Sequence, residues 1–60
     1  MTPAQFEREV KKILASENGD TRHDLDILLN KAVKSLRDRE DTELRHQISF
    51  VREMIKKGMI

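Results

Sequence analysis

Hydrophobic residues in the first part of the chain recur at helical spacing. Four of them fall on one face of a helix: Phe6, Val10, Ile13 and Leu14. Directly before them lies a capping box, with Thr2 at the N-cap, Pro3 at the first helical position and Gln5 at the third. Asn18-Gly19 predicts the end of the helix, because glycine adopts the left-handed conformation that follows many helices at no steric cost. We therefore expect a first helix over about residues 3–17.

A wider apolar stripe follows in the middle of the chain. Its members span an arc of about 140° on a helix, which is the width of a core-facing surface. They are Leu25, Leu28, Leu29, Ala32, Val33 and Leu36. Thr21 and Asp24 fit a second capping box, and Asp24 and Asp26 place negative charge at the positive end of the helix dipole. The pattern predicts a second helix over about residues 22–38, at the centre of the fold.

The connection to a third helix is less sharply marked, since residues 37–43 contain neither Gly nor Pro. Apolar residues resume after this polar gap at a phase turned by about 100°. They are Leu44, Ile48, Val51 and Ile55. This favours a break near residues 38–42 with Asp41 as N-cap, and a third helix over about residues 42–57 that ends before Gly58. The alternative is one long bent helix over about residues 22–57, which would need a dimer to cover both of its stripes.

No segment alternates apolar and polar residues as a half-buried strand does. The sequence therefore predicts an all-α fold, a small bundle of three short helices that forms a single domain over residues 1–60. A chain of this size buries only about 60% of the surface that it exposes when unfolded. Without cysteine it has neither disulfides nor thiolate metal sites to add stability. Self-association through the third helix, most simply as a homodimer, is therefore expected.

Charge and hydropathy narrow the class of protein. The 12 Lys and Arg nearly balance the 11 Asp and Glu, and the net charge of +1 argues against a broad surface for polyanions. The longest apolar runs, at residues 13–15 and 27–29, are too short to span a membrane or to form a secretory signal. We expect a cytoplasmic protein that does not bind membranes.

The residues that could carry chemistry do not form a catalytic or metal-binding pattern. His23 and Asp26 could offer two ligands to a metal, but a closed zinc site needs about four, and His46 lies in a different helix. The serines lack a glycine elbow or a paired base, and there is no glycine-rich phosphate loop. The carboxylates are explained by helix dipoles and by pairs such as Glu7 with Lys11. The sequence predicts no enzyme activity, no cofactor and no metal.

A basic stripe runs along the predicted third helix. Arg45, Arg52 and Lys56 recur with Ser49 at helical spacing. The recognition helix of a dimeric nucleic-acid-binding regulator could use such a stripe to contact phosphates and base edges. However, acidic residues crowd the N-terminal approach to this helix, and the chain has no aromatic platform for single strands. A solvated helix face is the simpler interpretation.

Several large apolar residues lie outside the predicted core stripes. Phe50 and Met54 lie about 90–130° from the centre of the third helix's stripe, on the side away from the basic residues. Ile27 projects almost opposite the core face of the second helix, and Met59-Ile60 form an apolar tail. A wide stripe and a frayed tail would explain these residues without any function. The small core instead favours an interface with a partner or a second copy.

Part of the sequence resembles known chains. The matching residues are Met1-Thr2-Pro3-Ala4-Gln5-Phe6, Val10, Ile13, Arg22-His23, Asp26 and Leu28-Leu29. Across about the first half of its length, the chain resembles short uncharacterised helical proteins encoded in phage and bacterial genomes. The resemblance implies a phage or prophage setting and indicates no activity.

The leading hypothesis is a non-enzymatic protein–protein interaction module, a small cytoplasmic regulator, inhibitor or adaptor that acts by surface binding. Its expected anchors are apolar: Ile27, Phe50, Met54 and Met59. A basic rim is expected to steer the partner: Arg45, Arg52 and Lys56. One alternative is the nucleic-acid-binding regulator that uses the basic stripe. Another is a structural oligomer of a phage-type assembly, which would use the apolar anchors on itself.

Overall fold

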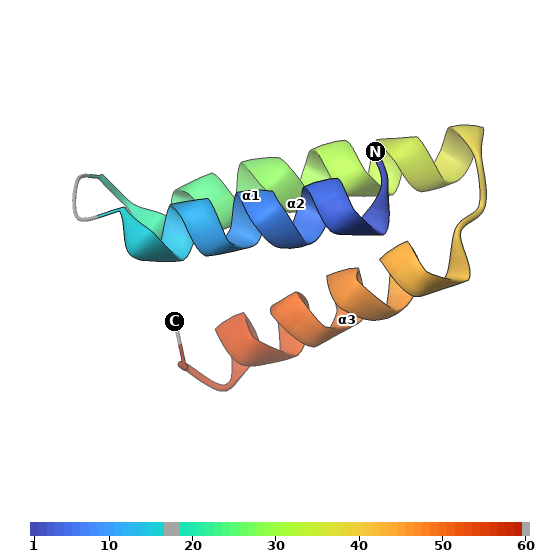
Figure 1. Cartoon of the computed structure of the whole chain (residues 1–60). Coiled ribbons are helices and arrows are strands. Elements are labelled where there is room, and N and C mark those ends of the chain that lie inside the picture. Colours follow the sequence, from blue (N-terminus) through green and yellow to red (C-terminus); the bar gives the residue numbers. More distant parts are fainter. Residues whose placement is uncertain (17–18, 60) are drawn as a thin grey trace.

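The protein is a bundle of three α-helices (Figure 1). The computed structural model describes residues 1–16 and 19–59, with α1 over Pro3–Ala15, α2 over Thr21–Asp38 and α3 over Thr42–Lys56. These described residues contain no strand, so the predicted all-α bundle is confirmed. The separation of α2 from α3 shows that the alternative of one long bent helix is wrong. Predictions that involve residues 17, 18 and 60 lie outside the described residues.

The helices run up, down and up, so that α3 points in the same direction as α1 (Figure 1). Each helix contacts both others. The N-terminal ammonium group of Met1 donates a hydrogen bond to Ser35 Oγ at 2.8 Å, which joins the start of α1 to α2. This arrangement leaves a boundary between α1 and α3 along one side of the molecule.

The start of α1 has the predicted capping box. Thr2 Oγ1 accepts a hydrogen bond from the Gln5 backbone N–H at 3.1 Å, and Gln5 Oε1 accepts one from the Thr2 N–H at 3.0 Å. The predicted end of α1 is wrong, since Ser16 caps the helix in an extended conformation directly after Ala15. Gly19 does have a positive φ of 102°, but it lies in the connection to α2 rather than at the end of α1.

The N-cap of α2 is Asp20, and the predicted N-cap at Thr21 is wrong by one residue. Asp20 Oδ1 accepts a hydrogen bond from the His23 backbone N–H at 3.2 Å, while Thr21 is the first helical residue. Aspartate caps helices at least as well as threonine, and its charge also interacts favourably with the helix dipole. The predicted end of α2 at Asp38 is confirmed.

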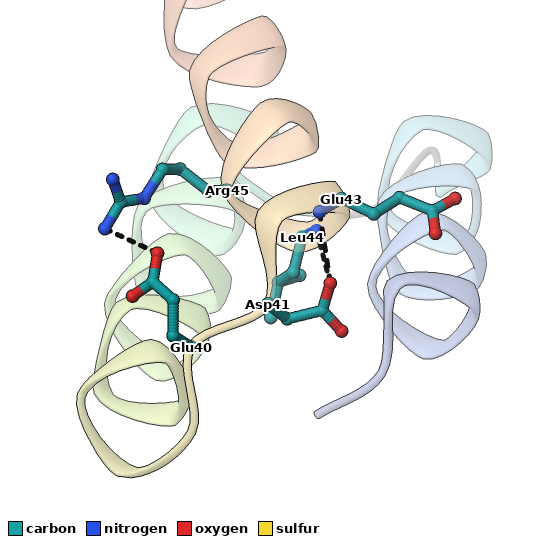
Figure 2. A network of polar contacts seen from close by, with 5 residues as sticks. All are labelled: Glu40, Asp41, Glu43, Leu44 and Arg45. Atoms are coloured by element: carbon teal, nitrogen blue, oxygen red, sulfur yellow. Dashed lines mark hydrogen bonds and ion pairs between the residues drawn. The ribbon is translucent and has the colours of Figure 1, made fainter.

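The turn between α2 and α3 needs neither Gly nor Pro because side chains stabilise it (Figure 2). Asp41 is the predicted N-cap of α3, and its Oδ1 accepts the backbone N–H groups of Glu43 at 3.1 Å and Leu44 at 3.2 Å. Glu40 forms an ion pair with Arg45 across the turn, with 2.7 Å between Oε1 and Nη2. The cap satisfies two N–H groups that have no partner within the helix. It therefore specifies where α3 begins.

The core combines one residue of α1 with the predicted stripes of α2 and α3. The buried residues are Phe6, Leu25, Leu28, Leu29, Ala32, Leu44, Ile48 and Val51. Around them pack half-buried residues: Val10, Ile13, Val33, Leu36 and Ile55. Leu14 does not belong to either group and is 44% exposed, although it was predicted to share one helical face with Phe6, Val10 and Ile13. No helix in the described part of the chain is long and apolar enough to cross a membrane.

Candidate interaction surface

The helix α3 has three distinct sides. At about 100° per residue, Phe50 and Met54 lie about 90–130° to one side of its buried stripe. The basic residues Arg45, Arg52 and Lys56 lie about 90° to the other side. The apolar pair and the basic stripe therefore point in nearly opposite directions from α3.

An open groove of about 550 Å³ lies between α1 and α3 on the side of Phe50. Residues of α1 form one wall: Phe6, Glu7, Val10, Lys11 and Leu14. Residues of α3 form the other: Glu43, His46, Gln47, Phe50, Val51 and Met54. The lining residues extend from Phe6 to Leu14 on α1 and from Glu43 to Met54 on α3, so the groove runs along both helices. These two helices run in the same direction (Figure 1). The groove offers a mainly apolar surface with charged residues along its walls.

A second hollow, of about 490 Å³, adjoins the groove at the C-terminal end of α3. It shares Phe50, Met54 and His46 with the groove and adds Ser49, Glu53, Lys57 and Met59. The two depressions therefore form one surface, with Phe50 at their common border. We call the residues that line either of them the groove surface.

The C-terminus of α3 holds Met59 in this surface. The Met59 N–H donates to the Met54 carbonyl at 2.9 Å, and the Gly58 N–H donates to the Ile55 carbonyl at 3.1 Å. These two bonds form a Schellman motif, in which Gly58 has a φ of 75°. In this motif the residue after the glycine commonly packs on the helix residue whose carbonyl it binds. Met59 is thus placed beside Met54 by the backbone and is not a frayed tail.

The predicted apolar anchors differ in exposure and in position. Phe50 is 66% exposed and Met59 69% exposed, whereas Met54 is half-buried between the two depressions. Ile27 is 43% exposed but lies on α2, and it lines neither depression. Leu14, which the sequence pattern placed on one face of the first helix, lines the groove. The structure brings three of the four anchors together and adds Leu14 from α1.

The predicted basic rim does not border the groove surface. None of Arg45, Arg52 and Lys56 lines either depression, and Arg45 forms an ion pair with Glu40. The cations that do line the surface are Lys11 and Lys57. Lys11 Nζ lies 3.3 Å from Glu7 Oε1 on the same helix, as the i,i+4 spacing predicts.

One polar atom in the groove surface has no partner. Gln47 Oε1 is buried and accepts no hydrogen bond within the described residues. A buried amide oxygen without a donor costs about 1–3 kcal/mol relative to a satisfied one. Sequence analysis did not single out Gln47, because its burial depends on how the helices pack together.

The structure brings no metal ligands together in the part of the chain that it describes. Residues 1–16 and 19–59 contain no cluster of three or more His, Cys, Asp or Glu side chains that could hold an ion. His23 lies near the start of α2 and His46 lies in α3, in the groove surface.

Comparisons with models of protein families, with curated proteins and with solved structures find no match to this chain.

Proposed function

We propose that the chain is a non-enzymatic protein-interaction module, a small regulator or adaptor that covers a surface on another protein. Its binding site is the groove surface, with Phe50, Met54 and Met59 as anchors. The single observation that carries this proposal is the position of Phe50, which is 66% exposed at the border of two adjoining depressions. Contiguous exposed apolar surface of this kind marks interaction sites.

The composition of the surface supports a protein partner. Aromatic residues and methionines are enriched at protein interfaces, and the surface combines Phe50 with Met54 and Met59. Methionine side chains also adapt to the shape of the group they contact.

The basic stripe supports a nucleic-acid partner less well. Its first cation, Arg45, is neutralised by Glu40, and Asp41 and Glu43 lie at the N-terminal end of the same helix. That is the end of a recognition helix that usually enters the major groove. The stripe also lies on the side of α3 that faces away from the groove surface. We therefore assign the anchors, rather than the stripe, to the binding function.

Affinity purification with matched variants tests this proposal. Phe50→Asp places a charge at the border of the two depressions, whereas Ile27→Asp makes the same kind of change at an exposed apolar residue outside them. Both variants should keep the helical circular-dichroism spectrum, because both side chains are exposed. A partner captured from a lysate of the source cells by wild type should be retained by Ile27→Asp and lost by Phe50→Asp.

Two other capture results would contradict the proposed binding site or enlarge it. If folded Phe50→Asp retains every protein that wild type captures, the groove surface is not the binding site. If Ile27→Asp loses the same partner as well, the binding site extends over α2 and is not confined to the groove.

A further inference from the structure

The groove surface contains a row of residues on α3 whose charges are arranged about Phe50. The row consists of residues at spacings of three and four, which lie on one side of the helix. In chain order they are Glu43, His46, Phe50, Glu53 and Lys57. All of them line the groove or the adjoining hollow. We call this row the α3 seam. In paired helices, charged residues that flank the apolar contacts form salt bridges between the helices and set their orientation.

The charges of the α3 seam complement those of the same seam in a second copy that runs antiparallel to it. In an antiparallel pair of helices centred on Phe50, residues equally far before and after Phe50 lie opposite each other. Glu43 of one copy then faces Lys57 of the other, and His46 faces Met54. Phe50 meets Phe50 at the centre. A parallel pairing would instead place Glu43, Glu53 and Lys57 each beside an identical charge.

We propose that a second copy of this chain binds the groove surface through an antiparallel α3–α3 pairing centred on Phe50. The two-fold axis passes beside Phe50, and every contact occurs twice, as in other symmetric dimers. The proposal rests on the proposed function, because it uses the same surface. It adds that a second copy occupies that surface when no other partner does, so that a partner must displace it.

The amount of exposed surface supports a second copy. The chain exposes 4689 Å², whereas a monomeric protein of 7.1 kDa is expected to expose about 4,100 Å². In the groove surface, Phe50, Met59 and Leu14 are 66%, 69% and 44% exposed. The pairing covers the anchors of α3 and brings them against the groove of the other copy. The exposed charges select the direction of pairing, and the apolar residues supply the affinity.

Charge reversal combined with sedimentation equilibrium tests the pairing at micromolar to millimolar concentrations. Wild type should show a monomer–dimer equilibrium. Glu43→Lys alone and Lys57→Glu alone should each raise the dissociation constant about tenfold or more, because each places like charges opposite one another twice. An equimolar mixture of the two variants should form a heterodimer, since the lysine introduced in one variant then faces the glutamate introduced in the other. Interference optics suit this chain, which contains neither Trp nor Tyr.

Arg52→Glu is the matched control, because it reverses a charge on the opposite side of α3 and should leave the dissociation constant unchanged. Glu43 lies in the first turn of α3, where a lysine opposes the helix dipole, so thermal unfolding must be recorded for each variant. Mixing the two variants distinguishes a defect in pairing from a defect in folding. A variant that fails to fold alone is not made to fold by mixing, whereas a charge mismatch is corrected. A folded wild type that stays monomeric at millimolar concentration would overturn the proposal, as would a mixture that shows no heterodimer.

The failures of this inference and of the proposed function are distinguishable. If wild type is a monomer but Phe50→Asp still abolishes capture of another protein, self-pairing is wrong and the proposed function stands. If the charge variants follow the expected pattern but Phe50→Asp retains every captured protein, the groove surface serves self-association and the proposed function is wrong.

Discussion

Phe50 and Val51 are neighbours in α3, yet Phe50 is 66% exposed and Val51 is 5% exposed. Successive residues of a helix point about 100° apart, so one faces the groove surface while the other packs in the core. The larger of the two apolar side chains is the one that the fold leaves in contact with solvent. Alanine substitutions at the two positions should therefore separate binding from stability.

Val51→Ala should lower the free energy of unfolding by about 2 kcal/mol, because it removes two buried methyl groups and leaves a cavity. Phe50→Ala should change it by less than about 0.5 kcal/mol, although it removes a larger group. Urea unfolding followed by circular dichroism measures both. A large loss of stability in Phe50→Ala that does not depend on protein concentration would show that Phe50 belongs to the core of the monomer.

Asp41 and Glu40 are adjacent carboxylates with different roles at the start of α3. Asp41→Ala should lower the free energy of unfolding by about 1 kcal/mol, because two backbone N–H groups lose their acceptor. Glu40→Ala should cost less than about 0.5 kcal/mol, because its ion pair with Arg45 is exposed. The midpoint temperature of thermal unfolding should fall by several degrees in Asp41→Ala only. A larger shift in Glu40→Ala than in Asp41→Ala would mean that the ion pair, and not the cap, specifies the turn.

Gly58 allows the chain to turn Met59 back towards Met54. Its φ of 75° is left-handed, and an added Cβ would meet no atom within 4 Å, so only backbone strain opposes a side chain there. Gly58→Ala should lower the free energy of unfolding by about 1 kcal/mol, and Gly58→Asn by less, because asparagine tolerates this conformation better. Urea unfolding of both variants tests the order. If alanine were tolerated as well as glycine, the Schellman motif would not hold the end of α3.

Gln47 offers a test of what a buried oxygen without a hydrogen-bond partner costs the fold. Gln47→Met preserves length and helix propensity while removing the buried oxygen that has no partner. The variant should be as stable as wild type or more stable by up to about 1 kcal/mol, because it no longer buries an oxygen without a donor. Urea unfolding followed by circular dichroism measures the difference. A marked loss of stability would show that Gln47 supports the fold instead.

The sequence patterns predict the helices well because each helix is specified locally. The stripe that begins at Leu25, the phase change before Leu44 and the cap at Asp41 all appear in the structure as expected. Errors occur where neighbouring residues compete, as when Asp20 rather than Thr21 caps α2. They also occur at the end of α1, where Ser16 ends the helix before any glycine.

The candidate site was predictable only in part. A helical wheel separates Phe50 and Met54 from the core of α3, and it places the basic residues on the other side. It cannot show that α1 packs alongside this face, which brings Leu14 into the groove beside residues of α3. This arrangement depends on how two helices distant in sequence are packed. Spacing within one helix carries no information about it.

The groove surface is the proposed site of contact between this protein and another protein chain. Photo-crosslinking tests it most directly, with a benzophenone side chain introduced at Phe50 in one variant and at Arg52 in a second. Position 50 should yield covalent adducts with a partner protein or with a second copy, and mass spectrometry distinguishes the two. Position 52, on the opposite side of α3, should yield few adducts. Equal adduct yields at the two positions, or adducts at position 52 alone, would contradict the account.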